Sequence, residues 1–196
     1  MRLGILVSGR GSNLDAVLQA AANGQLGGMQ PVIVISNRRG VPALGVARRH
    51  GVPARTLSRA DFSSFEARDE AIARMLAAEE VDLALLAGYD QRLRGTYFSN
   101  FPGRTFNIHP ALLPAHGGRG MMGLAVHRAV LAAGDHETGV TIHQVTPELD
   151  TGGIVAQVRV AIRPGESAEE LESRLLPVEH ALLVRTLAGL AAARAG

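Results

Sequence analysis

The stretch Leu3-Gly4-Ile5-Leu6-Val7-Ser8-Gly9-Arg10-Gly11-Ser12-Asn13 decides the fold of this chain. Its first part, Leu3–Val7, is a continuous apolar run, which is typical of a parallel strand buried on both faces. A glycine-rich loop follows, and helical spacing begins at Leu14 and lasts to about Ala22. A buried strand, a glycine turn and a helix in this order predict the first unit of an α/β fold.

The same alternation continues along the chain. Strands are predicted at 31–35, 52–57, 83–87 and 104–109, and helices at 41–50 and 65–78. Strands that alternate with helices at this spacing predict a doubly wound, mostly parallel sheet. After a helix at 124–133, two strands at 139–145 and 154–162 have no helix between them, which predicts an antiparallel C-terminal extension. A final helix runs from a cap at Ser167 through Leu190.

Composition limits the classes of protein to consider. The chain has 196 residues, 46% of them hydrophobic, which predicts one globular domain with a real core. The net charge of +2 is too small to argue for nucleic acid as a partner. Cysteine is absent, which excludes disulfides, thiol nucleophiles and cysteine-bound metal and fits a cytoplasmic protein. No apolar run is expected to span a membrane. The oligomeric state stays open, with a homodimer as one option.

The stretch Asn107-Ile108-His109-Pro110-Ala111-Leu112-Leu113-Pro114 is the strongest candidate for chemistry. Asn107 and His109 stand two residues apart, so on a strand they point to the same side. Pro110 ends the strand, and ligands of α/β proteins bind where strands end. A lone histidine here would more often satisfy a hydrogen bond in the core. With Asn107 beside it and Asp150 to consider, the functional interpretation is favoured.

Asp150 is the candidate acid–base partner. It lies in a turn-rich loop after the strand that carries His143. A carboxylate near His109 would raise the pKa of the imidazole, and a cationic histidine beside an amide suits an oxyanion in acyl transfer. Taken alone, Asp150 in Asp-Thr-Gly-Gly is better explained as a turn residue.

The loop Gly9-x-Gly11-Ser12-Asn13 can hold an anion at the start of a helix. A plain tight turn with a polar cap explains the same residues. A dinucleotide site would need a third glycine where Leu14 stands. Arg38 or Arg39 could meet a 2′-phosphate, so an NADP enzyme stays open. A monophosphate ester is the best fit. A metal site is not predicted, because the seven histidines form no close ligand pair.

Three motifs resemble, in order and spacing, those of the folate-dependent formyltransferases, and within them of the phosphoribosylglycinamide formyltransferases. They are Ser8-Gly9-x-Gly11-Ser12-Asn13, Asn107-Ile108-His109-Pro110-x-Leu112-Leu113-Pro114 and Glu148-Leu149-Asp150-x-Gly152. Glu179-His180 and Leu86-Ala87-Gly88-Tyr89 also match, so the resemblance covers nearly the whole chain. It implies a Rossmann-like formyltransferase fold in a single domain, residues 1–196. About 1–100 would form the phosphate-binding half, and about 101–196 the catalytic and folate-binding half.

The resemblance implies transfer of a formyl group from 10-formyltetrahydrofolate, a co-substrate, to the glycyl amine of 5-phosphoribosylglycinamide in purine biosynthesis. The amine would attack directly, without metal, nucleic acid or membrane. Asn107 and protonated His109 would stabilise the oxyanion, and Asp150 would keep His109 charged. The substrate-binding roles would fall on Gly11, Ser12 and Asn13 for the phosphate, Glu179 for the ribose, and Asp90, Gln91, Arg92, Leu93 and Asn107 for the folate.

The chain departs from the family pattern in three places. Asp90-Gln91 replace the usual Met-Arg, and Phe65 replaces an arginine, with Arg68 one turn further along. The resemblance implies that both positions help to bind the glutamate tail of the folate. Leu176 replaces a polar residue that faces the phosphate. In addition, the segment Gly117–Gly123 makes its loop longer than the commonest form, and a substrate lid and a passive insertion both stay open.

Other functions share part of these residues. A 10-formyltetrahydrofolate hydrolase has the same Asn, His and Asp but uses water as the acceptor, and typically carries an extra N-terminal domain. A methionyl-tRNA formyltransferase would need a C-terminal RNA-binding domain. A non-catalytic phosphate-binding module would need only the glycine loop and gives no reason for Asn107, His109 and Asp150 to occur together.

Overall fold

The chain folds around one seven-stranded sheet in the order β3-β2-β1-β4-β5-β6-β7. The computed structural model describes residues 1–195. The strands are β1 (Arg2–Val7), β2 (Gln30–Ser36), β3 (Ala54–Thr56), β4 (Leu83–Leu86), β5 (Arg104–His109), β6 (Glu137–Gln144) and β7 (Ile154–Ala161). Strands β1 to β5 pair in parallel, and β6 and β7 are antiparallel. The predicted doubly wound sheet with an antiparallel extension is confirmed.

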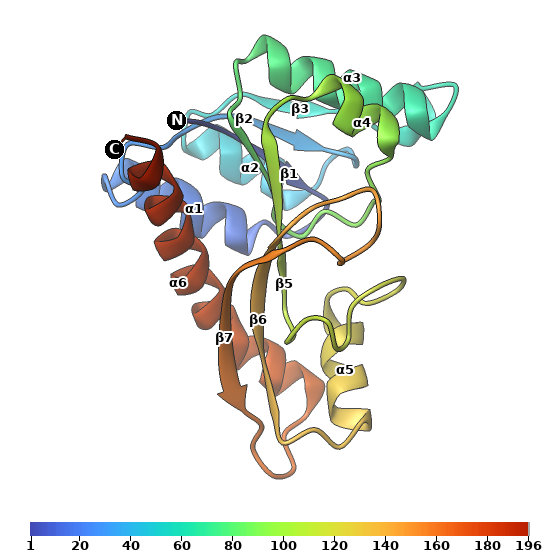
Figure 1. Cartoon of the computed structure of the whole chain (residues 1–196), viewed down its shortest axis with the longest axis vertical. Helices are drawn as coiled ribbons and strands as arrows, with labels where there is room; N and C mark the ends of the chain where they lie inside the picture. The colour runs from blue at the N-terminus through green and yellow to red at the C-terminus, as the bar shows by residue number, and fades with distance from the viewer. Residues whose placement is uncertain (196) are drawn as a thin grey trace.

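Helices cover both faces of the sheet (Figure 1). They are α1 (Ser12–Ala22), α2 (Pro42–Arg49), α3 (Phe65–Ala78), α4 (Gly95–Asn100), α5 (Leu124–Ala132) and α6 (Ala168–Ala195), with a 3₁₀ turn at Arg59–Asp61. One apolar cluster joins α1, α2 and α6 to the sheet, and a second joins α3 and α4 to the opposite face. The short α4 and the 3₁₀ turn were missed because neither contains an apolar period long enough to recognise.

Strand β1 lies at the centre of both clusters. Leu3, Ile5 and Val7 point into one cluster and Leu6 into the other, and all four are fully buried. Because its neighbours β2 and β4 are parallel, the carboxyl ends of these strands meet at one edge of the sheet. The glycine loop after β1 therefore opens at the edge where ligands bind in such folds.

Helix α6 concerns the expectation that no apolar run could span a membrane. Its segment Ala168–Arg194 is long and apolar enough to cross a membrane by length and composition. The helix instead packs its apolar stripe against α1, β6 and β7, burying Leu171, Leu175, Leu183 and Leu187. These leucines account for part of its apolar content, and 33% of its apolar 18-residue window is buried. The predicted cap is also present, since the Ser167 hydroxyl accepts from the Glu170 amide at 3.2 Å.

Candidate active site

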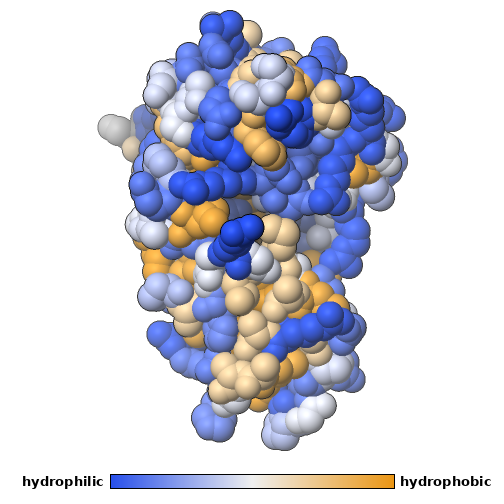
Figure 2. Space-filling view, turned by 90° about the vertical axis from the view of Figure 1, so that its right-hand side faces the viewer, coloured by the Kyte–Doolittle hydropathy of each residue, from blue (hydrophilic) through white to orange (hydrophobic). Residues whose placement is uncertain are grey.

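A cleft of about 770 Å³ opens where β1, β4 and β5 end. The face of the molecule in Figure 2 is hollowed in the middle, with mostly hydrophilic residues above the hollow and apolar residues gathered below it. Every site residue predicted from the sequence lines this cleft. These residues are Gly11, Ser12, Asn13, Asp90, Gln91, Arg92, Leu93, Asn107, His109, Asp150 and Glu179.

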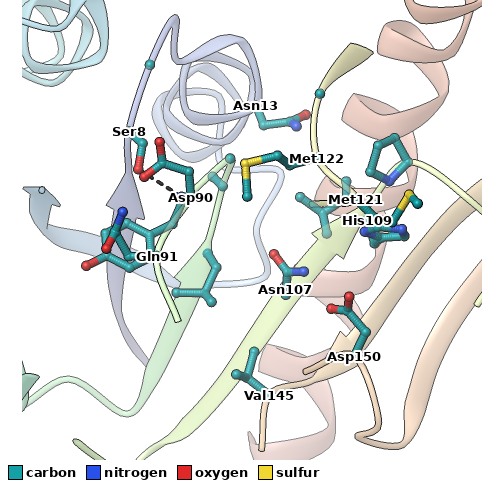
Figure 3. A pocket seen from close by; sticks show the side chains of 18 of the residues that line it. Ser8, Asn13, Asp90, Gln91, Asn107, His109, Met121, Met122, Val145 and Asp150 are labelled. Carbon is teal, nitrogen blue, oxygen red and sulfur yellow. Dashed lines mark hydrogen bonds between the residues drawn. The ribbon is translucent and has the colours of Figure 1, made fainter. Parts of the chain in front are cut away.

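Asn107 and His109 enter the cleft from the end of β5. The antiparallel partner strand β6 places His143 opposite Asn107 and Thr141 opposite His109. In Figure 3, Asn107 lies between Asp90 and Gln91 on one side and His109 and Asp150 on the other. The strand spacing therefore brings the amide and the imidazole to the same cleft, as predicted.

His143 orients the Asn107 amide. The Nδ1–H of His143 donates to the Gln144 carbonyl at 3.0 Å, because a carbonyl can only accept. In the neutral ring Nε2 is then an acceptor, and it takes a hydrogen bond from Asn107 Nδ2 at 3.1 Å. The second N–H of the Asn107 amide stays available for a ligand. The sequence analysis mentions His143 only because its strand precedes Asp150. No local pattern shows which residue faces Asn107 across the sheet.

His109 is buried, and its environment favours the neutral imidazole. Burial lowers its pKa, and the nearby His143 and His116 rings act in the same direction. The His116 carbonyl, which accepts from His109 Nε2 at 2.8 Å, and the Asp150 carboxylate oppose this shift. Desolvation of the ring therefore works against the cationic His109 expected from the sequence, and the Asp150 carboxylate works for it.

Asp150 reaches the site from the loop between β6 and β7. Its Oδ2 accepts from the Gly118 amide at 2.7 Å, and its Oδ1 lies 3.5 Å from His143 Nε2. Burial lowers the pKa of His143, so the latter approach is not an ion pair at neutral pH. Asp150 acts on His109 through its electric field, and no direct hydrogen bond joins the two. The contact with Gly118 also shows that the longer loop Gly117–Gly123 borders Asp150.

The glycine loop forms the opposite end of the cleft. Gly11 has a φ of 84°, and a side chain there would bring Cβ within 2.8 Å of Ala43 Cβ, so the position requires glycine. It precedes α1, whose first turn has no side-chain cap among the described residues. Asn13 donates to Glu179 Oε2 at 2.8 Å, and burial raises the pKa of Glu179 to about 6. Free amides and polar groups thus meet at one helix start.

The segment Asp90–Leu93 is anchored from behind rather than free in the cleft. Asp90 accepts from Asn37 Nδ2 at 2.8 Å and from the Arg38 guanidinium. Arg38, which was left open as a contact for a 2′-phosphate, is therefore engaged within the protein. Arg68 donates to Gln91 Oε1 at 3.2 Å and is fully buried. Arg68, which lies one turn along α3 from Phe65, is thus enclosed in the protein and its guanidinium is used by internal partners.

Several residues that line the cleft were not singled out as site residues in the sequence. They are Arg10, Met121, Met122, His127 and Glu172. Arg10 and Glu172 stand far apart in the chain and meet only through the packing of α6 on α1. Their proximity has no signal in the local sequence.

Comparison with known proteins places the chain among relatives of one kind. The model of the formyl transferase family matches residues 1–187. The chain is 35% identical over 182 residues to phosphoribosylglycinamide formyltransferase of Escherichia coli, covering 93% of this chain and 83% of that protein. It is 38% identical over 190 residues to the trifunctional purine biosynthetic protein adenosine-3 of Drosophila melanogaster, covering 96% of this chain. The chain spans 14% of the length of that larger protein.

Solved structures agree with the sequence relatives. The crystal structure of glycinamide ribonucleotide transformylase 1 from Symbiobacterium toebii superposes with a TM-score of 0.92 at 38% identity, covering 99% of this chain and 89% of that one. Phosphoribosylglycinamide formyltransferase from Bacillus halodurans gives a TM-score of 0.89 at 33% identity, covering 97% of this chain and 95% of that one. Fold, family model and relatives converge, and the chain belongs to the formyl transferase family.

Proposed function

We propose that this chain transfers the formyl group of 10-formyltetrahydrofolate to the glycyl amine of 5-phosphoribosylglycinamide, a step of purine biosynthesis. The observation that carries the proposal is one cleft with an anion-binding helix start at one end and Asn107, His109 and Asp150 at the other. The relatives named phosphoribosylglycinamide formyltransferase support the choice of substrates.

In this proposal the substrate amine attacks the formyl carbon directly. A carbon–nitrogen bond forms, and the formyl oxygen becomes an oxyanion. The free N–H of Asn107 donates to that oxygen, because its other N–H is held by His143. The tetrahedral intermediate then collapses with loss of the folate nitrogen, which must gain a proton to leave.

The proton has a path through His109. A neutral imidazole at rest can accept the proton that the attacking amine releases. The imidazolium that results is stabilised by the field of Asp150 and adds positive charge beside the oxyanion. The proton then passes to the leaving folate nitrogen, so the enzyme returns to its neutral state.

The remaining roles complete the proposal. Gly11, Ser12 and Asn13 bind the phosphate and Glu179 the ribose, while Asp90, Gln91, Arg92 and Leu93 border the folate. The chain works as a single domain, with the phosphate-binding half at about 1–100 and the catalytic and folate-binding half at about 101–196. The reaction takes place in the cytoplasm on small molecules.

The proposal is tested by following the folate product by absorbance with and without phosphoribosylglycinamide. Tetrahydrofolate is expected to form only when the ribonucleotide is present, together with an equal amount of formylated ribonucleotide. Equal deformylation without the ribonucleotide would instead identify water as the acceptor and a hydrolase as the function.

The pH dependence of kcat tests the protonation state of His109. At saturating substrates, kcat is expected to fall at acid pH with an apparent pKa below the ordinary histidine value of about 6.5, and to stay level above it. Asp150→Asn is expected to move this acid limb to still lower pH, because the carboxylate raises the pKa of His109. A rate that instead declines as pH rises through about 6.5 would mean that the cationic form is the active resting form.

A further inference from the structure

Arg10 lies at the end of the cleft where the phosphate is proposed to bind. Its side chain does not contribute to the packing of the fold. It belongs to the glycine loop, its side chain is 73% exposed, and it lines the cleft. Its Nη2 lies 2.5 Å from Oε1 of Glu172 on α6. Glu172 is 20% exposed, and the ion pair remains open to solvent on the arginine side. Such a pair contributes little to stability, so the guanidinium can leave Glu172 at little cost.

The face of α6 that meets this loop is unfavourable for an anion. Glu172, Leu176 and Glu179 are spaced four and three residues apart, so they share one side of the helix, and all three line the cleft. Two carboxylates thus flank the start of α1, and the apolar Leu176 between them can donate no hydrogen bond. A phosphate dianion that binds at the helix start needs a cation nearby to offset this repulsion.

Arg10 is placed to supply that cation. It neighbours Gly11 in the chain, and its charge acts on Glu179, the hydrogen-bond partner of Asn13. Three other arginines that line the cleft have partners within the protein: Arg38 pairs with Asp90, Arg92 donates to the Pro147 carbonyl and Arg94 pairs with Glu66. Arg119 also lines the cleft, from the segment Gly117–Gly123, and serves below as the competing candidate.

We propose that Arg10 is a specificity residue for the phosphate of the ribonucleotide and that it exchanges Glu172 for the phosphate when the substrate binds. This inference rests on the proposed function. The planar guanidinium presents two parallel N–H groups to phosphate oxygens, a geometry that a carboxylate and a phosphate both accept. Glu172 then competes with the phosphate for the guanidinium and holds Arg10 in place in the free enzyme.

The test compares two acceptors, phosphoribosylglycinamide and the same compound without its phosphate, at saturating formyl folate. Arg10→Ala is expected to raise KM for the phosphorylated acceptor about tenfold and to leave kcat unchanged, as the loss of one charge-assisted hydrogen bond predicts. KM for the dephosphorylated acceptor is expected not to change. Arg10→Lys is expected to restore part of the loss, because lysine keeps the charge but not the paired N–H groups.

Two further variants sharpen the test. Glu172→Gln is expected to lower KM for the phosphorylated acceptor by about threefold, since it releases Arg10 from an exposed ion pair. Arg39→Ala is the matched control, because Arg39 has the same 73% exposure and a 2.5 Å ion pair with Asp61 but does not line the cleft. Arg39→Ala is expected to leave both KM values unchanged.

The outcomes separate this inference from the proposed function. If wild-type protein does not formylate the ribonucleotide, the proposed function fails and the inference with it. If wild type is active but Arg10→Ala changes neither KM, or changes both equally, only the inference is overturned. Arg119→Ala reproducing the phosphate-dependent loss in place of Arg10→Ala would overturn it as well.

Discussion

Replacing His109 by asparagine is expected to lower kcat by about 10²- to 10⁴-fold, the usual contribution of a positioned acid–base group. The amine could still attack, but no group at that point would accept its proton. Asparagine keeps a polar side chain that can donate to the His116 carbonyl, the present partner of His109 Nε2 at 2.8 Å. The measurement is kcat together with the Kd for phosphoribosylglycinamide by calorimetry. The Kd is expected to change little because the glycine loop, the proposed phosphate site, lies at the other end of the cleft.

The control for this variant is His136→Asn, which makes the same substitution at an exposed histidine outside the cleft. It is expected to leave kcat unchanged. Asp150→Asn is a second variant to compare with wild type. Asp150 has a φ of 55°, and asparagine tolerates this left-handed region well, so the substitution removes the charge without straining the backbone. An unchanged kcat in His109→Asn, with folding intact, would show that the assigned role is wrong.

Replacing Asp69 by alanine is expected to cost about 3–5 kcal/mol of unfolding free energy, the largest stability loss predicted for a single substitution here. Asp69 and Arg68 are both fully buried. Arg68 donates to Asp69 Oδ1 through Nε at 2.9 Å, and the Arg94 amide donates to Asp69 Oδ2 at 2.9 Å. Without the carboxylate, the guanidinium would be a buried charge with no counter-ion. Urea unfolding of each variant measures this loss.

The same variant is expected to affect the cleft. Arg68 holds Gln91 through its side chain and Arg92 through its carbonyl, at 3.2 and 3.3 Å. A displaced Arg68 would therefore loosen the segment Asp90–Leu93, which is proposed to border the folate. KM for formyl folate is then expected to rise, with little change in KM for the ribonucleotide.

Glu70→Ala is the matched control for Asp69→Ala. Glu70 is the next residue of α3 and forms an exposed ion pair with Arg74, so its loss is expected to cost less than about 1 kcal/mol. The double variant Arg68→Met/Asp69→Ala is expected to recover part of the stability, because it removes the charge together with its partner. If Asp69→Ala costs no more than Glu70→Ala, the pair is not a determinant of stability.

Much of the architecture could be predicted because its signals are local. The buried runs of β1 and β4, the helix at Phe65–Ala78 and the change of pattern before β6 each follow from the periodicity of a single segment. The motifs that carry Gly11, Asn107, His109 and Asp150 are equally local. The parallel order of β1 and β5 brings the first three to one edge of the sheet, and Asp150 reaches the same cleft from the loop between the antiparallel strands β6 and β7.

Burial of individual side chains could not be predicted from the sequence. Arginine is usually exposed, yet the packing of α3 on the sheet encloses Arg68 completely. His109 was expected to be cationic because Asp150 is near, and burial of the ring opposes that charge by lowering its pKa.

By itself the sequence determined the α/β topology, the antiparallel extension and the positions of the reactive groups, since these depend on residue type and spacing along the chain. Only the tertiary structure decided which residue faces which across the cleft. The pairing of β5 with β6 sets His143 against Asn107, and the packing of α6 on α1 sets Glu172 against Arg10. Partner identity, burial and hence pKa depend on contacts between distant segments, and a local pattern does not contain them.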